Sequence, residues 1–92
     1  MLPSNIQLFP NPATDEIQIQ IAIDKKSHLR IEILDLTGKK LKSSYKNLIA
    51  SGSHTFVEDI SRLIPGVYMV HLIQSAEDTG ISQSQGIKFF KR

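Results

Sequence analysis

Hydrophobic and polar residues alternate along much of this chain, and the alternation predicts a protein built from β-strands. The clearest case is a run of isoleucines at every second position, Ile17, Ile19, Ile21 and Ile23. Successive side chains of a strand point to opposite faces, so this run predicts one face in a core and the other in water. A second half-buried strand is expected over residues 29–33, with a bulge where the alternation breaks at residues 34–36.

The longest apolar run, residues 63–73, predicts the central strand of a sheet. Its two faces hold Val67, Met69, His71 and Ile73 on one side and Tyr68, Val70 and Leu72 on the other. Both faces are mostly apolar, so we expect this strand to be covered above and below. The dipeptide Pro65-Gly66 just before it predicts a sharp corner. As in the tyrosine corner of Ig-like folds, the Tyr68 hydroxyl is expected to be buried and bonded to backbone between residues 59 and 65.

Turn residues divide the first half of the chain into further strands. Residues 1–14 form a proline-containing lead-in, in which residues 6–9 are a short edge strand that Pro10 ends. Gly38 supplies the positive φ of a hairpin turn after the second strand. The return strand, residues 40–45, is rich in lysine, which suits an exposed sheet edge.

The second half follows the same pattern. A short strand is expected over residues 54–58, followed by a single helical turn that Asp59 caps. A final strand covers residues 81–90, where Gly86 marks a bulge or a close backbone approach. About seven short strands and no substantial helix predict one all-β domain, residues 1–92, with the architecture of an Ig-like antiparallel β-sandwich.

Composition narrows the functional classes. The 92 residues contain no cysteine, which excludes disulfides and thiolate metal sites, and the net charge of +2 gives no strong field. We therefore expect no nucleic-acid partner. Because no apolar run approaches the roughly 18 residues of a membrane span, no direct insertion into a membrane is expected. The first residues also lack the basic and apolar pattern of a signal peptide.

Candidate chemistry is sparse. His28, His54 and His71 lack metal-ligand spacing, and neighbouring acidic residues would point to opposite faces of a strand. No calcium loop, nucleophile elbow or phosphate-binding glycine loop is present. The sequence therefore predicts no catalytic, cofactor or metal site. His28 and His54 are expected to be exposed, and His71 to be hydrogen-bonded or on a sheet surface.

Four segments in order, residues 8–15, 33–41, 63–70 and 87–92, resemble the C-terminal sorting domain, type A, of the type IX secretion system (the Por system). The matching positions are Pro10, Asn11 and Pro12 in the lead-in, Gly38 in the hairpin, Gly66 and Tyr68 at the corner, and Lys88 and Lys91 near the end. The resemblance implies an Ig-like sandwich without a cofactor, covalently linked to an N-terminal cargo domain.

The same resemblance implies a route and partners. The cargo would cross the periplasm and reach the cell surface or the extracellular space through an outer-membrane translocon. A shuttle protein of that system and a surface sortase, which removes the domain, would be its partners. Exposed Lys88, Lys91 and Arg92 are expected to offer a basic handle to a receptor.

Two other functions remain open from the residues alone. An Ig-like or fibronectin-like accessory module on a secreted enzyme would bind carbohydrate or protein, and exposed aromatic residues on one sheet face would favour it. An enzyme would need a deep pocket lined by His71 and a carboxylate.

Overall fold

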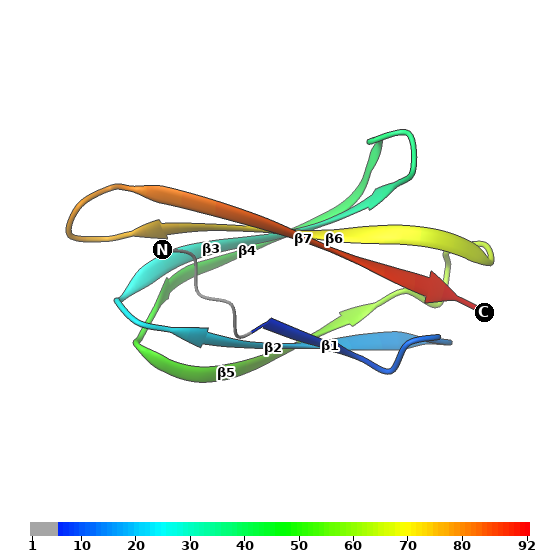
Figure 1. Ribbon diagram of the computed structural model, residues 1–92, viewed down its shortest axis with the longest axis horizontal. Coiled ribbons are helices and arrows are strands. Elements are labelled where there is room, and N and C mark those ends of the chain that lie inside the picture. The colour runs from blue at the N-terminus through cyan, green and yellow to red at the C-terminus, as the bar shows by residue number, and fades with distance from the viewer. Residues whose placement is uncertain (1–5) are drawn as a thin grey trace.

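The computed structural model describes residues 6–92, and these form seven antiparallel strands in two packed sheets (Figure 1). The strands are β1 Ile6–Phe9, β2 Glu16–Ile23, β3 Ser27–Asp35, β4 Lys40–Ile49, β5 Gly52–Asp59, β6 Gly66–Ala76 and β7 Ser82–Lys91. One sheet has the order β1-β2-β5 and the other β4-β3-β6-β7. The all-β sandwich expected from the sequence is confirmed.

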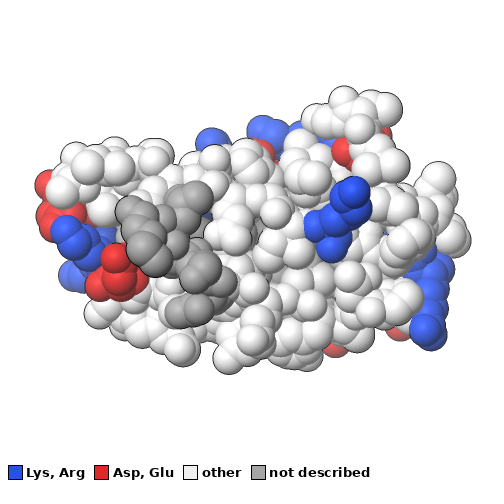
Figure 2. All heavy atoms as spheres, viewed as in Figure 1, with Lys and Arg blue, Asp and Glu red and all other residues white. Residues whose placement is uncertain are grey.

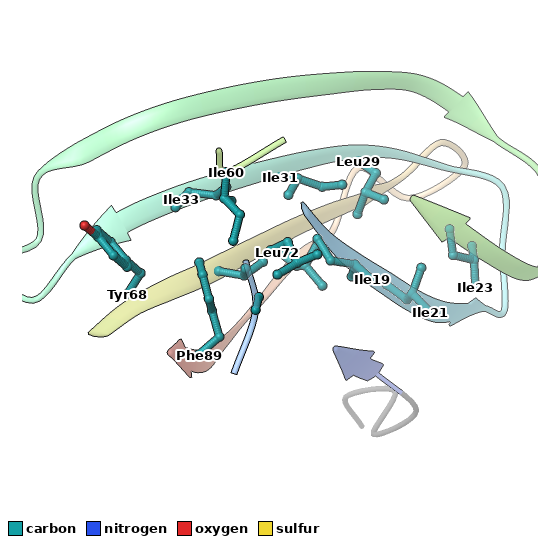
Figure 3. Packing of buried hydrophobic residues seen from close by; sticks show 13 residues of the cluster. Ile19, Ile21, Ile23, Leu29, Ile31, Ile33, Ile60, Tyr68, Leu72 and Phe89 are labelled. Carbon is teal, nitrogen blue, oxygen red and sulfur yellow. The ribbon is translucent and has the colours of Figure 1, made fainter. Parts of the chain in front are cut away.

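The core lies between the two sheets and is mainly aliphatic. The isoleucines of β2 are all buried, as their alternation predicts, and they face buried side chains of β3 and β6 (Figure 3). Phe89 of β7 and Ile60, which follows β5, complete the cluster and are each 1% exposed. Removing such a side chain from water contributes about 1.5–3 kcal/mol, so this core is the main source of stability in a chain without disulfides.

The position of β6 confirms one expectation and corrects another. It lies between β3 and β7, so it is a central strand. Its inward residues Tyr68, Val70 and Leu72 are buried, but Met69 and His71 on its other face are only half-buried. The expectation of cover on both faces is wrong because the fold has two layers. The outer face of β6 is shielded only by side chains of the neighbouring strands.

The turn between β3 and β4 forms as its residues predict. Gly38 has a φ of 87°. The register of the β3–β4 pair shifts between Ile33 and Leu34, but the extra residue is Leu41 of β4, so the irregularity lies on the return strand and not at residues 34–36 as expected. The Asp35 carboxylate accepts hydrogen bonds from the backbone N–H groups of Thr37, at 2.9 Å, and Lys39, at 3.0 Å. These bonds, after that from the Thr37 hydroxyl, hold the pKa of Asp35 below its ordinary value.

The segment after β5 is a hydrogen-bonded turn and not the expected helical turn. The Asp59 carboxylate accepts from the Ser61 N–H at 2.8 Å, and the Leu63 N–H donates to the Ile60 carbonyl at 3.0 Å. The turn does not extend into a helix because Pro65 disfavours helical geometry at Ile64.

Gly86 marks a close approach and no bulge. The β6–β7 ladder is unbroken from Gly66 opposite Lys91 to Ser75 opposite Ser82. A Cβ atom added to Gly86 would lie 3.0 Å from the Met69 Sδ. The glycine therefore leaves room for the methionine side chain on the outer face of the sheet.

Candidate recognition site at the junction of the two ends of the chain

The residues predicted to be functional gather at one end of the sandwich. Strands β1, β3 and β7 end there and β6 begins there, which Figure 1 shows at the right of the molecule. Across the sheet, Asp35 lies opposite Tyr68, and Tyr68 lies opposite Phe89. The lead-in contacts the last residues of β7 directly, and the Pro65-Gly66 corner begins the neighbouring strand β6. The Gly38 turn follows β3, one strand further across the sheet.

Backbone bonds join the lead-in to the end of β7. Ala13 is fully buried and forms a parallel bridge with Lys91. Its N–H donates to the Phe90 carbonyl and its carbonyl accepts from the Arg92 N–H, both at 2.8 Å. The Asn11 side-chain oxygen accepts from the Phe90 N–H at 2.9 Å. We call this contact between residues 10–14 and 90–92 the terminal junction.

The expectation of an exposed basic end is wrong for Lys91. Its side chain is 7% exposed, and its ammonium group donates to the Thr14 carbonyl. The reason is the alternation of β7, in which Lys91 points to the same inner side as the buried Phe89. A buried charge is tolerated only with such a partner. Lys88 and Arg92 are exposed, as expected.

Tyr68 is a structural residue of this end. It is 6% exposed, and its hydroxyl donates to the Ile64 carbonyl at 2.6 Å. Its ring stacks on that of Phe89, with 5.8 Å between the centroids. The tyrosine corner expected from the sequence is confirmed.

The exposed part of the junction is what another protein can reach. Pro10, Asn11 and Pro12 are all exposed. Beside them, the Phe90 ring is 55% exposed on the outer face of the four-stranded sheet. The exposure of Phe90 could be predicted from the alternation of β7. Because Phe89 lies in the core, the next residue points outward.

Sequence reasoning missed an ionic cluster on the same outer face. Glu32 is 5% exposed and accepts from the Lys40 Nζ at 2.8 Å. The Arg30 Nε and the His71 Nδ1 each lie 3.5 Å from its carboxylate. The Lys40 hydrogen bond is the largest cause that holds the Glu32 pKa below its ordinary value. Arg30 and Glu32 share a face by alternation, but the approach of Lys40 and His71 depends on the strand order.

Each of the three histidines contacts a neighbouring side chain or backbone group. His71 lies on the sheet surface, as expected, beside a carboxylate that basic side chains already surround. His28 and His54 are half-buried where exposure was expected, because His28 stacks on Tyr45 and the His54 Nε2 lies 2.7 Å from the Ala50 carbonyl. Within residues 6–92 there is no group of three potential His, Cys, Asp or Glu metal ligands.

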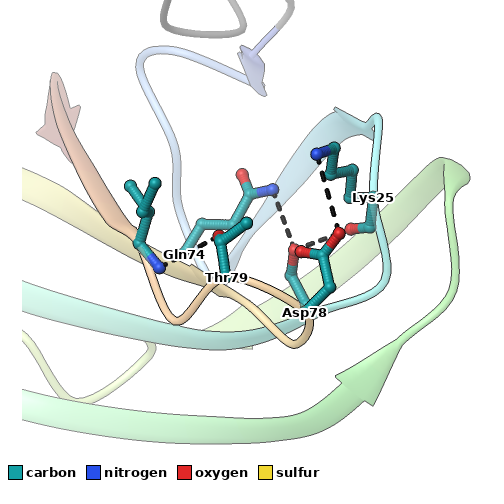
Figure 4. A network of polar contacts seen from close by, with 6 residues as sticks. Lys25, Gln74, Asp78 and Thr79 are labelled. Carbon is teal, nitrogen blue, oxygen red and sulfur yellow. Dashed lines mark hydrogen bonds and ion pairs between the residues drawn. The ribbon is translucent and has the colours of Figure 1, made fainter.

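The opposite end of the sandwich carries a polar network (Figure 4). The buried Gln74 amide donates to the Ser27 hydroxyl at 3.1 Å, which donates to the Lys25 carbonyl at 2.6 Å. The Lys25 ammonium lies 3.6 Å from the Asp78 carboxylate. These bonds tie the β2–β3 and β6–β7 turns together, so the network has a structural explanation.

The exposed aromatic residues of the four-stranded sheet do not form one platform. Tyr45, which is 63% exposed, and Phe90 both lie on its outer face. Tyr45 is in register with Arg30 and, through it, with Ile73 of β6, whereas Phe90 is in register with Val67. Six positions of β6 therefore separate the two rings.

Comparisons with known proteins agree with this architecture. The model of a family described as "Secretion system C-terminal sorting domain" matches residues 7–84, which leaves Lys88 and Lys91 outside the match. Among solved structures, the chain is similar to dimeric latent PorU from Porphyromonas gingivalis, with a TM-score of 0.74 and 17% sequence identity. The similarity covers 94% of this chain and 9% of that one, and at this identity it shows the fold alone. No curated protein matches the chain. Within the described residues, no helix is long and apolar enough to cross a membrane.

Proposed function

Because the chain belongs to the family of secretion system C-terminal sorting domains, we propose that it directs an attached cargo protein through the outer membrane by the type IX secretion system. A type IX sorting signal serves export to the cell surface or the extracellular space. In the finer proposal, the cargo precedes residue 1 in the same polypeptide and crosses the periplasm. The translocon and its shuttle protein bind the domain, and a surface sortase then removes it.

The family match over residues 7–84 is the observation that carries the proposal. The fold supports it, because a label must fold by itself and stay distinct from its cargo. The core described above is formed within the chain, and the terminal junction holds the lead-in against β7. Residues 10–14, close to the end that would join the cargo, are thereby fixed to the folded domain.

The terminal junction is the surface that we propose the secretion machinery reads. It combines the exposed Pro10–Pro12 segment with the exposed side chains of Lys88, Phe90 and Arg92. An aromatic ring flanked by basic groups suits a partner surface with an apolar pocket and acidic neighbours. Tyr68 and Lys91 act beneath this surface by holding β7 in place.

An export assay tests the function. Residues 1–92 are fused behind a reporter with a periplasmic signal in a host that has the type IX system, and surface reporter is measured. We expect surface reporter with the domain and periplasmic reporter without it. A folded fusion that stays in the periplasm would contradict the proposal.

Point variants test the recognition surface better than truncation does. Deleting residues 87–92 removes the core residue Phe89, so lost export would report unfolding. Phe90→Ser combined with Lys88→Glu changes exposed side chains only, and we expect export to fall while the melting temperature stays the same. Phe89→Ala is the control that lowers both. If the surface variant were exported at an unchanged level, the secretion machinery would not recognise the junction.

Removal by a sortase is tested on the exported reporter. We expect its intact mass, measured by mass spectrometry, to lack the whole domain. In a host without the sortase, the reporter is expected to retain residues 1–92. A surface reporter that keeps the domain in both hosts would contradict removal.

A further inference from the structure

The two long sides of the sandwich differ in how they are closed. On the side of β4 and β5, polar side chains connect the two sheets. The Lys42 ammonium lies 3.3 Å from the Glu58 carboxylate, and the Ser44 hydroxyl donates to it at 3.0 Å. The Lys46 ammonium lies 5.6 Å from the centre of the Phe56 ring. This side is therefore closed by a row of contacts between its two edge strands.

The opposite side, formed by β1 and β7, has a shallow hollow between the sheets, about the size of one water molecule. Its lining includes the core residues Ile21 and Leu72 together with Ile6, Gln83 and Gln85. An apolar side chain that covered this hollow would shield the edge of the aliphatic core. The described part of β1 spans only Ile6–Phe9, whereas β7 is ten residues long.

The outward backbone groups of β7 are used at one end of the strand only. The N–H and C=O groups of Phe90 bond to Asn11 and Ala13, so Phe90 directs its backbone away from β6. The direction of the backbone N–H and C=O groups alternates along a strand. The groups of Ser84, Gly86 and Lys88 therefore also point away from β6. Within residues 6–92, none of these groups has a hydrogen-bond partner.

This edge also has little of the usual protection against strand addition. Natural edge strands carry lysine, proline or bulges, and β4 has lysines at positions 40, 42 and 46. Between Ser82 and Phe90, by contrast, the only charged residue is Lys88, and there is neither proline nor a register shift. Figure 2 views the molecule from the side on which β1 and β7 lie. Apart from one basic group right of the centre, the charged side chains visible there lie at the two ends and along the rims.

We propose that the β7 edge from Ser84 to Lys88 binds an extended segment of a partner protein as an added strand. The terminal junction fixes one end of this docking edge, because Asn11 and Ala13 already occupy the next backbone groups. Side chains of an added strand alternate, so every second one faces the hollow over Ile21 and Leu72 and is apolar. On the other face of the added strand, an acidic side chain pairs with exposed Lys88.

Amide exchange measured by NMR tests the edge in the isolated chain, so the result is independent of export. In the free chain, we expect rapid exchange at Ser84, Gly86 and Lys88 and slow exchange at Gln85 and Ile87, which point to β6. The probe is a nine-residue peptide that alternates valine with threonine and carries glutamate at both ends. Its addition is expected to slow exchange at the three outward amides at least tenfold.

Two variants at Ser84 separate the edge from the fold. Ser84→Pro removes an outward N–H group and leaves the ladder to β6 intact, whereas Ser84→Thr keeps the N–H group. We expect both to melt near the temperature of the unchanged chain, and only Ser84→Pro to lose peptide binding at least tenfold. Lys88→Glu is expected to bind the glutamate peptide more weakly than a matched lysine peptide.

Several outcomes would overturn the proposal. Slow exchange at the three outward amides in the dilute free chain would show an edge already occupied within the chain. Slow exchange that appears only as the chain concentration rises would assign the edge to a second copy of the chain. Peptide binding that Ser84→Pro leaves unchanged would place the bound peptide elsewhere.

Discussion

Replacing Tyr68 with phenylalanine isolates one hydrogen bond at the corner before β6. The substitution removes the hydroxyl that donates to the Ile64 carbonyl and retains the ring that stacks on Phe89. A net hydrogen bond contributes about 0.5–1.5 kcal/mol, and a buried carbonyl left without a partner costs about 1–3 kcal/mol. Because Ile64 is 75% exposed, water can partly replace the lost donor. We therefore expect a loss of about 1–2 kcal/mol in the free energy of unfolding.

Tyr45 provides a matched control for the same chemical change. Its hydroxyl lies 3.0 Å from the His28 Nδ1, but the side chain is mostly exposed on an edge strand. Water can replace this contact, so Tyr45→Phe is expected to change the free energy of unfolding by no more than about 0.5 kcal/mol. The difference between the two variants measures the partly buried corner bond.

Urea denaturation gives the free energies, and thermal melting followed by circular dichroism gives an independent value. For a domain of this size, the Tyr68 variant is expected to melt about 5–10 °C below the unchanged chain. Equal effects of the two variants would refute the reasoning from burial. Normal stability of Tyr68→Phe with lost export would instead make the Tyr68 hydroxyl a recognition group.

Three further perturbations test other parts of the structure. Asn11→Ala leaves the Phe90 N–H to water and is expected to lower the free energy of unfolding by about 1 kcal/mol in urea titrations, with faster exchange of the Phe90 amide. Gly38→Ala places a Cβ at a φ of 87° and is expected to cost about 1–2 kcal/mol, measured in the same way. The pKa of Glu32 is lower in the folded chain than its ordinary value of 4.5. The ionised carboxylate therefore stabilises the fold above pH 4.5, and this stabilisation is lost as the pH falls through the folded pKa. Glu32→Gln is therefore expected to lose less of its melting temperature between pH 6 and pH 3 than the unchanged chain does.

Each of these three predictions can be contradicted by one specific result. An Asn11 variant with unchanged Phe90 exchange would mean that the side chain does not hold the end of β7. A Gly38 variant of normal stability would show that the hairpin turn can adopt another geometry. If Glu32→Gln and the unchanged chain lost the same melting temperature between pH 6 and pH 3, the ionic cluster would not be a source of pH dependence.

The sequence was sufficient for features that depend on neighbouring residues. Alternation located the strands, and Gly38 with Asp35 predicted the hairpin turn, because the φ preference and the side-chain bonds are local. The tyrosine corner was also predictable, since the Tyr68 hydroxyl reaches a carbonyl only four residues away.

Features that depend on strand order could not be predicted in the same way. The burial of Lys91 requires Thr14 beside it, 77 positions earlier in the chain. Likewise, Lys40 and His71 approach Glu32 from the two strands that flank β3, and the two-layer packing alone decides that the outer face of β6 stays partly open. Alternation assigns residues to faces, but it does not say which strands are neighbours.

The terminal junction also means that the fold can be completed only at the end of translation. The bond between Asn11 and Phe90 spans 79 positions of a 92-residue chain, so almost the whole sequence must leave the ribosome before it can form. A polypeptide that stops before Phe89 lacks both a core ring and the last residues of β7, which bond to Asn11 and Ala13. A chain that ends prematurely would therefore fold without the terminal junction.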